Sequence, residues 1–377
     1  MAKNINKSPY TQETLEKLGI FAECFREWFP VFLHNRSVKA IHVYDFFAGS
    51  GTDSDGERGS PPLLLHEARG ENNSHCDQAK KSGKTVVFHF NEKLKGKSRE
   101  LSDNIDAYKK ECVKTCNGHC PFSFGQTQAE FKEIFETEDF LQILNDPSCG
   151  KFILLDQYGF NQVEEGIFKQ LVDAPKTDFV FFISSSQIKR FKNHPAIKRY
   201  FDTQKIPFDE ARPCDCHRQI ADYYQSLVPH GKAYYLHNFT IQKGGNYWGL
   251  IFGSNHTLGM EKFLKVCWSK DPHAGESNFN IDNDWEPGTL FSQSEQSQKV
   301  KRVKNELRTS VLNREIATNI DGLRSALQKR CLPKLFIEVV KEMEGENLIS
   351  VSCADGSKPS YAATNIHKVE AFQIHLK

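Results

Sequence analysis

The most informative stretch of this chain is 41-IHVYDFFAGSGTDSDGERGSPP-62, in which a short apolar run is followed at once by a glycine-rich turn. Residues 41–47 are mainly β-branched and aromatic, which predicts a strand. Ser60-Pro61 predicts the start of a helix, with serine as the cap and proline in the first turn. A strand, a glycine turn and a helix in this order form the context that a cofactor-binding loop requires.

Outward from this turn, strand-like and helix-like segments alternate. The first helix is expected to open at Thr11 as its cap, and Lys243-Gly-Gly245 predicts a hairpin between the last two strands. Residues 187–230 are irregular and mostly helical in pattern. The predicted strands are 41–47, 85–93, 121–126, 151–160, 177–186, 233–242 and 246–255, and the predicted helices are 11–35, 60 onward, 95–119, 128–145 and one before residue 177.

This alternation predicts an α/β fold with a parallel sheet covered by helices on both faces. The terminal hairpin favours a methyltransferase fold over a dinucleotide-binding fold. Ordinary dinucleotide-binding sheets end in a parallel strand, whereas class I methyltransferases insert an antiparallel last strand. We therefore expect a Rossmann-like class I methyltransferase domain over residues 1–267. Residues 268–298 are polar and poor in aliphatic residues, which predicts a linker.

Residues 299–377 are expected to form a winged-helix domain, because three helical segments precede two short strands, LISVS and AFQIHLK. Between residues 299 and 334 there are ten Lys and Arg against three Asp and Glu, a local basic patch that can neutralise phosphates. Such a patch is also compatible with a solvated helix face or a protein-docking domain. The candidate nucleic-acid-binding residues are Lys301, Arg302, Lys304, Arg308 and Lys334.

The glycine turn predicts a site for S-adenosylmethionine. Its two glycines permit close backbone approach by a ligand, and the next helix offers free amide donors. Glu92 lies just past the second strand, where a carboxylate can accept both ribose hydroxyls. Ser54 stands where a dinucleotide fingerprint needs a third glycine, which disfavours NAD; the remaining alternative is a plain tight turn. The candidate cofactor-binding residues are Asp45, Phe47, Ala48, Gly49, Gly51 and Glu92.

Asp156-Gln157-Tyr158 ends the fourth predicted strand, at the sheet edge where ligands of α/β proteins bind. In amino-methyltransferases an acid or amide here accepts hydrogen bonds from the target amine, and an aromatic residue stacks on the base. These three residues are our candidate catalytic group, although the usual motif has proline in the second position. Asp156 is also compatible with a purely structural cap. Residues 184–186 and Arg190 would face the same crevice, as substrate ligands or as caps.

Two groups of cysteines resemble metal ligands without matching a known spacing. Cys112, Cys116 and Cys120 recur every four residues, with His119 beside them, and Cys214 and Cys216 form a second group. Neither contains the Cys-x2-Cys knuckle of common zinc sites, so we predict no metal. The alternative to this prediction is a single zinc site that both groups of cysteines share. An odd total of eleven cysteines at irregular spacing indicates reduced thiols in a cytoplasmic protein.

Bulk properties agree with a soluble chain. A length of 377 residues suits one large α/β domain with an appendage, and a net charge of +1 excludes a general polycation. The N-terminus lacks the apolar region of a signal peptide, and no apolar run reaches the roughly 18 residues of a membrane span. We therefore expect a cytoplasmic protein that does not enter a membrane.

Several separated segments resemble one family. YDFFAGSGTDSDGERGSP, LLDQYGFNQV, TDFVFFISSSQIKRF and LPKLFIEVVKEMEGENLI are together similar to the three-Cys-motif partner protein (TcmP) family, and the resemblance runs from about residue 11 to the end. It implies a bacterial or phage-associated protein on mobile or defence loci, and a partner that resembles radical-SAM enzymes and carries three cysteines. It brings no settled reaction.

Three functions follow as hypotheses. The first is an S-adenosylmethionine-dependent methyltransferase acting on nucleic acid. The second is a non-catalytic recognition subunit for the radical-SAM-like partner. The third, a nuclease, ranks last because the sequence shows no carboxylate cluster with the spacing of a two-metal site.

Overall fold

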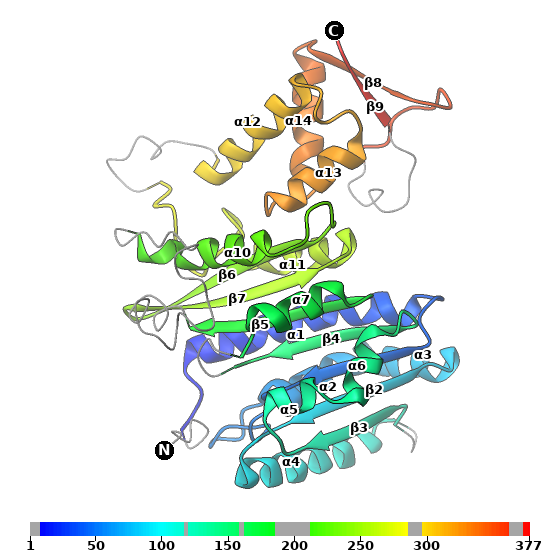
Figure 1. Ribbon diagram of the computed structural model, residues 1–377, viewed down its shortest axis with the longest axis vertical. Helices are drawn as coiled ribbons and strands as arrows, with labels where there is room; N and C mark the ends of the chain where they lie inside the picture. The colour runs from blue at the N-terminus through cyan, green and yellow to red at the C-terminus, as the bar shows by residue number, and fades with distance from the viewer. Residues whose placement is uncertain (1–7, 117–119, 158–161, 185–211, 286–295, 362–371) are drawn as a thin grey trace.

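The chain forms a seven-stranded sheet between two layers of helices, and a smaller helical unit with a two-stranded ribbon follows it (Figure 1). The computed structural model describes residues 8–116, 120–157, 162–184, 212–285, 296–361 and 372–377.

The sheet has the order β3-β2-β1-β4-β5-β7-β6. β1 to β5 are parallel to one another, and β7 pairs antiparallel with both β5 and β6. A parallel sheet with one antiparallel strand inserted near its edge is the expected Rossmann-like methyltransferase arrangement, so the predicted fold class is confirmed. The strands are β1 (Ala40–Asp45), β2 (Thr85–Asn91), β3 (Phe122–Thr127), β4 (Cys149–Leu155), β5 (Thr177–Ser184), β6 (Tyr235–Lys243) and β7 (Asn246–Ser254).

The two faces of the sheet carry separate hydrophobic cores, because side chains alternate along each strand. In β1, Ile41 and Val43 belong to one core and Tyr44 to the other. The first face is covered by α1 (Gln12–His34), α2 (Ser60–Arg69), α3 (Ser74–Ser82), α4 (Lys95–Val113) and α11 (Thr257–Lys270). The second is covered by α5 (Phe131–Phe135), α6 (Glu138–Asn145), α7 (Glu165–Asp173) and α10 (Cys216–Ser226). Two short 3-10 turns, η2 (Glu71–Asn73) and η3 (Pro213–Asp215), precede α3 and α10.

Helix α1 is the predicted amphipathic helix, with Phe21, Phe25 and Phe29 fully buried at helical spacing. Leu15 has the same helical spacing, with Leu18 and Phe21 following it, but it is exposed. Thr11 occupies the cap position, but its side chain makes no capping hydrogen bond. With 23 residues α1 is the longest described helix, and neither it nor any other described helix is long and apolar enough to cross a bilayer.

The predicted helix 128–145 is two helices, α5 and α6. The chain breaks after Phe135 because Thr137 starts a new helix by accepting a hydrogen bond from the backbone N–H of Phe140. Several predicted strands were also too long at their carboxyl ends. Residues 46–47, 92–93 and 156–157 lie in loops beyond the strands, which is where an α/β sheet places its ligand-binding residues.

The polar segment after α11 is ordered by hydrogen bonds as far as residue 285. The Asp271 carboxylate accepts bonds from the backbone N–H groups of residues 273, 274, 276 and 277. Thr240 of the edge strand β6 donates its N–H to Glu276 O at 2.7 Å and accepts from Asn278 N at 3.1 Å. Residues 276–278 therefore cover the free edge of β6.

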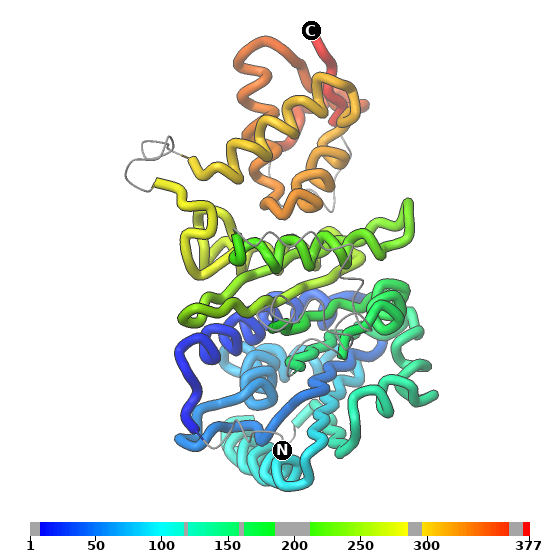
Figure 2. Tube along the Cα trace, turned by 60° about the vertical axis from the view of Figure 1, so that its left-hand side comes forward, coloured from blue at the N-terminus to red at the C-terminus, as the bar shows by residue number. Residues whose placement is uncertain are grey.

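The C-terminal unit has its own core and follows the predicted order of elements: α12 (Gln298–Leu312), α13 (Asn319–Gln328), α14 (Lys334–Gly345), β8 (Ile349–Cys353) and β9 (Phe372–Leu376). β8 and β9 pair antiparallel, and Thr318 forms a bridge to Gln373. α13 contacts α11 and β6, so the unit stacks beyond that edge of the sheet (Figure 2). Buried Lys299 joins the two parts by an ion pair with Glu276 at 2.8 Å.

Candidate cofactor and acceptor site

The glycine loop leaves β1 at the carboxyl edge of the sheet. Gly49 and Gly51 have φ of 63° and 84°, a left-handed backbone that favours glycine. The loop closes on itself, because Gly59 N donates to Gly51 O at 2.8 Å immediately before α2. A side chain at Gly51 would also lie 3.2 Å from Leu101 Cδ1. Conformation and space thus both require glycine at position 51.

Asp45 ends β1 and is fully buried. Its carboxylate accepts hydrogen bonds from Phe47 N at 3.1 Å and from the Ser60 hydroxyl at 2.6 Å. Ser60 is therefore not the helix cap that we predicted; the cap position is Gly59, and the serine hydroxyl donates to Asp45. Burial raises the pKa of Asp45 to about 7, because the bonds from Ser60 and Phe47 only partly offset the loss of water.

Glu92 follows β2 at the same edge. One of its carboxylate oxygens accepts a 2.7 Å hydrogen bond from Leu94 N at the start of α4, and the side chain is half-buried. The preceding residue, Asn91, donates its side-chain amide to Phe46 O at 3.1 Å, and Asn91 O accepts from Ala48 N at 2.9 Å. The ends of β1 and β2 are thus tied together, so Asp45 and Glu92 flank one loop.

Phe47 and Ala48 complete the predicted cofactor residues, and the structure places both on the loop after β1. Phe47 is half-buried, and its ring lies 5.4 Å from that of Phe131. Ala48 is buried, which keeps the chain close to the sheet. These two residues shape the loop through packing, whereas Gly49, which is half-buried, and Gly51, which is buried, supply its left-handed turn.

Two residues that we did not select also shape this loop. The Asn104 side-chain amide of α4 donates to Ser50 O at 2.7 Å. Tyr10 N donates to the Asp53 carboxylate at 2.7 Å, and a Cβ placed on Gly59 would lie 3.0 Å from the Tyr10 hydroxyl. Burial, with the nearby carboxylates of Asp53, Asp156 and Asp45, raises the pKa of Tyr10. Nothing local in the sequence indicated this contact, which spans more than forty residues.

Asp156 lies past the end of β4 and forms an ion pair with Lys17 of α1. Lys17 Nζ lies 2.7 and 2.6 Å from the two carboxylate oxygens, and both side chains are mostly buried. The ammonium also lies 4.7 Å from the centre of the Phe182 ring. The predicted acceptor-orienting acid therefore already has a cationic partner, which sequence inspection missed because Lys17 is 139 residues away.

Gln157 is 1% exposed, and both ends of its amide are used. It donates to Phe182 O at 2.9 Å and accepts from Gln162 N at 2.8 Å. This residue joins the ends of β4 and β5. Tyr158 lies outside the described residues, as do residues 185, 186 and 190 of the predicted crevice, and Ser184 is the last residue of β5.

The cysteines do not form the shared zinc site that we considered as an alternative. Among the described residues, no group of three or more Cys, His, Asp or Glu could hold a metal ion. Cys112 and Cys116 lie in the core beneath α4 with their sulfurs 4.0 Å apart, and burial raises the pKa of Cys112 to about 11. Cys216 instead lies on α10, 3.8 Å from His217 Nδ1.

Two residues of the basic patch in the C-terminal unit form ion pairs with acids of α14, which begins where our count of charges ended. Lys304 lies 2.7 Å from Glu342, and Arg308 forms an ion pair with Glu346. Arg302 lies 3.8 Å from Glu306 and is mainly exposed. The predicted nucleic-acid residues on α12, including Lys301, and Lys334 at the start of α14 thus belong to a mixed-charge surface.

Comparison with known proteins gives fold-level neighbours only. No family model and no curated protein sequence matches this chain. Among solved structures, Trm1 from Pyrococcus horikoshii in complex with S-adenosyl-L-methionine has 9% sequence identity and a TM-score of 0.36, over 69% of this chain and 59% of that one. This chain therefore spans less than two thirds of Trm1.

Two further neighbours are methyltransferases by name. The N-terminal domain of human METTL16 in complex with SAH has 8% identity and a TM-score of 0.31, over 66% of this chain and 72% of that one. The putative methyltransferase yhhF from Escherichia coli has 13% identity and a TM-score of 0.28, over 67% and 91%. The strand order, rather than these scores, establishes that this chain has a methyltransferase-like Rossmann fold.

Proposed function

We propose that this chain binds S-adenosylmethionine at the carboxyl edge of its sheet and transfers the methyl group to an exocyclic amine of a nucleic acid. One observation carries the proposal: the left-handed glycine turn follows a fully buried acid at the end of β1, in a sheet of order 3-2-1-4-5-7-6. The open backbone of the turn and the acid of the neighbouring strand are the groups that a nucleoside cofactor needs.

The residues present fit the cofactor. Gly49 and Gly51 hold the left-handed backbone that turns the loop after β1, and Glu92 offers a carboxylate just past the end of β2 for the ribose hydroxyls. Asp45 holds the loop through Phe47 N and the Ser60 hydroxyl. The cofactor supplies a methyl group on a positively charged sulfur, and the chain supplies its position beside the acceptor.

Asp156 is the residue that we propose to orient the acceptor. The Asp156 carboxylate would accept an N–H from the exocyclic amine and would thereby direct the nitrogen lone pair at the methyl group that the bound cofactor would supply, and the proton that the amine loses would pass to this carboxylate. Lys17 contacts both carboxylate oxygens, and each oxygen keeps a further lone pair through which an entering amine can bind beside the lysine or displace it. We propose Lys17 as the residue that neutralises Asp156 until the acceptor arrives.

Calorimetry with S-adenosylmethionine and S-adenosylhomocysteine tests the binding step. Saturable binding of both supports the proposal, and no binding at millimolar ligand contradicts it. Transfer of a labelled methyl group to DNA or RNA tests the chemistry: Asp156→Ala should eliminate transfer and retain cofactor binding. If transfer by this variant stays within a few-fold of wild type, Asp156 is structural.

We further propose that the C-terminal unit is a winged helix that positions the polymer. Its three helices followed by the β8–β9 ribbon support this, as does the bond from Ile374 N to Ala317 O at 2.9 Å, which belongs to an isolated antiparallel bridge between β9 and the residues before α13. Lys334, which is exposed, and Arg302, which is 67% exposed and 3.8 Å from Glu306, would contribute more to phosphate binding than Lys304 and Arg308, which form closer ion pairs with acids of α14.

A second function is favoured by the occupied acceptor site. Lys17 holds Asp156, and Gln157 is used entirely in joining two strands. A recognition subunit that keeps the cofactor site but performs no transfer would have these features. As the TcmP resemblance implies, its partner would be the three-cysteine, radical-SAM-like protein, in a bacterial phage-defence setting. Co-purification with that partner, combined with cofactor binding but no methyl transfer, would select this function.

A further inference from the structure

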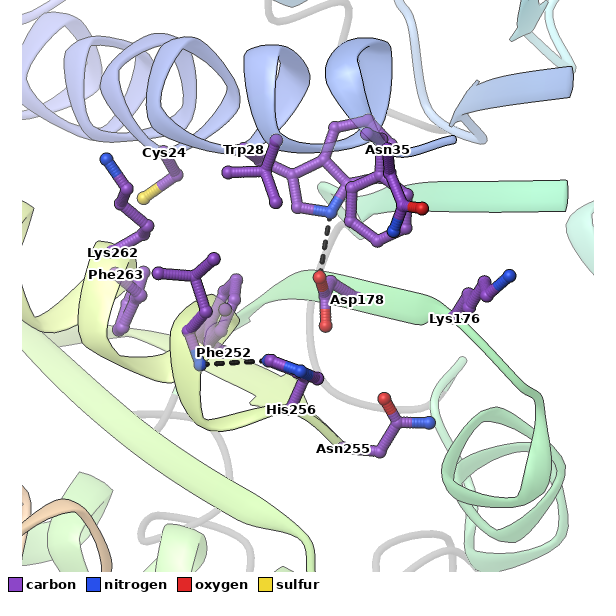
Figure 3. A pocket seen from close by; sticks show the side chains of 14 residues that line it. Cys24, Trp28, Asn35, Lys176, Asp178, Phe252, Asn255, His256, Lys262 and Phe263 are labelled. Atoms are coloured by element: carbon purple, nitrogen blue, oxygen red, sulfur yellow. Dashed lines mark hydrogen bonds between the residues drawn. The ribbon is translucent and has the colours of Figure 1, made fainter. Parts of the chain in front are cut away.

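A second cavity lies at the amino edge of the sheet, away from the glycine loop. Its volume is about 310 Å³, and it lies among α1, the start of β5, the end of β7 and the first turn of α11 (Figure 3). This size is at the lower end of small-molecule sites. Aromatic side chains form much of its wall: Trp28, Phe32, Phe252 and Phe263.

Asp178 places a carboxylate in this largely apolar wall. The residue is 3% exposed, and its Oδ2 accepts a 2.8 Å hydrogen bond from Trp28 Nε1. The Ser254 side chain also hydrogen-bonds to it. Among the described residues no lysine, arginine or histidine forms an ion pair with this carboxylate. Burial therefore raises its pKa to about 6.

Three basic residues also line the cavity, and each has a hydrogen-bond or ion-pair partner other than Asp178. Lys262 pairs with Glu27 at 2.7 Å, and Lys176 donates to the Ser37 hydroxyl at 2.9 Å. His256 caps α11, and its Nδ1 accepts from Leu258 N at 3.0 Å. An anionic ligand would meet the Asp178 carboxylate inside, so these residues do not make an anion site.

The floor of the cavity depends on a glycine. Gly259 lies in the first turn of α11, and a Cβ there would lie 2.4 Å from Ser254 Oγ and 3.2 Å from Asp178 Oδ2. The absence of a side chain lets the helix pack closely on the carboxylate without filling the space in front of it.

We propose that this cavity binds a flat aromatic molecule that donates an N–H group to Asp178. The aromatic walls suit a planar ring, and the buried carboxylate, which has about four acceptor sites, can accept a further N–H beside the bond from Trp28. Trp28 already makes a contact of this type, because its indole N–H donates a hydrogen bond to Asp178. The site is separate from the glycine loop, so it stands independently of the proposed methyltransferase function.

Indole and benzofuran test the proposal, since they have nearly the same shape but only indole has an N–H donor. Protein-observed NMR titrations of the full chain should show indole, and the stronger donor 2-aminobenzimidazole, binding at least tenfold more tightly than benzofuran. Asp178→Asn should remove that preference, because its amide can still accept from Trp28 but no longer offers a carboxylate.

A cavity-filling variant locates the binding. Val31→Trp, which places a large ring in the lining, should abolish indole binding, whereas Leu15→Trp at an exposed position of the same helix should leave it unchanged. Equal binding of indole and benzofuran would overturn the proposal, as would unchanged indole binding in both Asp178→Asn and Val31→Trp. Absence of binding of all three probes at millimolar concentration would also overturn it.

Discussion

Helix α1 contacts a buried carboxylate at each edge of the sheet, and it provides the two carboxylates with different kinds of hydrogen-bond donor. At the carboxyl edge, Lys17 provides Asp156 with a full positive charge at 2.6 Å. At the amino edge, about 16 Å further along the helix, Trp28 gives Asp178 only a neutral N–H at 2.8 Å. The first acid is compensated as an ion pair, whereas the second retains a raised pKa because burial is not offset by a cation.

The difference shows that burial alone does not define a site; the partner decides what the acid can do. A carboxylate held by a lysine can exchange that lysine for another donor, which suits an acceptor that enters and leaves. A carboxylate with only neutral donors favours a permanent or tightly matched N–H ligand.

The largest effect should come from the glycine loop, on which the ligand-binding role of the carboxyl edge depends. Gly49→Val should weaken S-adenosylmethionine binding at least 100-fold, about 3 kcal/mol, because a β-branched residue neither adopts the left-handed backbone nor leaves room for a ligand. Calorimetry measures the loss.

Gly83→Val is the matched control for strain. Gly83 has nearly the same φ, 64°, but it ends α3 at the other edge of the sheet, and no atom would lie within 4 Å of an added Cβ. This variant should lose a similar amount of stability and retain cofactor affinity. An equal loss of affinity in both variants would remove the glycine loop from the proposed site.

Removing the cation should expose the dependence of Asp156 on its partner. Lys17→Met should lower the free energy of unfolding by about 2–3 kcal/mol, because it leaves a mostly buried carboxylate unpaired. Urea unfolding measures the change. The double variant with Asp156→Asn should recover much of the loss; if the two single effects simply add, the ion pair is not the cause.

Asp178 should make the stability of the protein depend on pH. Its folded pKa, about 6, lies above the ordinary value of about 3.9, so the native state holds the proton more tightly and stability falls as pH rises between these values. Between pH 5 and 8 the wild type should lose about 1.4 kcal/mol more stability than Asp178→Asn. Parallel stability profiles of the two proteins over this range would contradict the raised pKa.

The smallest effect concerns whether a polymer at the carboxyl edge also uses the C-terminal unit. Arg302→Ala with Lys334→Ala should reduce the salt dependence of nucleic-acid binding by up to about two phosphate contacts, each about 0.7–0.9 log units per tenfold change in salt. Lys304→Ala with Arg308→Ala is the matched double variant. Because its charges are already paired with α14, it should change the slope less, and the reverse order would show that the α14 acids do not neutralise α12.

Much of the fold could be read from the sequence because its signals are local. The apolar runs of β1, β4 and β5, the spacing of Phe21, Phe25 and Phe29, and the Lys-Gly-Gly hairpin all depend on neighbouring residues. The glycine turn could be located for the same reason, since φ values near 60–85° follow from residue type and immediate context.

The partners of the charged groups could not be read in this way. Asp156 was selected correctly as a residue at the carboxyl edge, but only the packing of α1 across the sheet decided that Lys17 neutralises it. The basic patch was selected from α12, and only the pairing of α12 with α14 showed that Lys304 and Arg308 face acids. Residue type alone does not specify which helix faces a charge.

The sequence by itself thus determined the α/β alternation, the antiparallel end of the sheet and the position of the candidate cofactor loop. Tertiary structure alone decided that Asp156 pairs with a lysine and that Asp178 accepts a hydrogen bond from a tryptophan side chain. It also decided that a cavity lies between α1 and α11. The physical reason is range: backbone conformation and side-chain periodicity are set within a few residues, whereas the free energy of a buried charge depends on groups that folding brings from more than a hundred residues away.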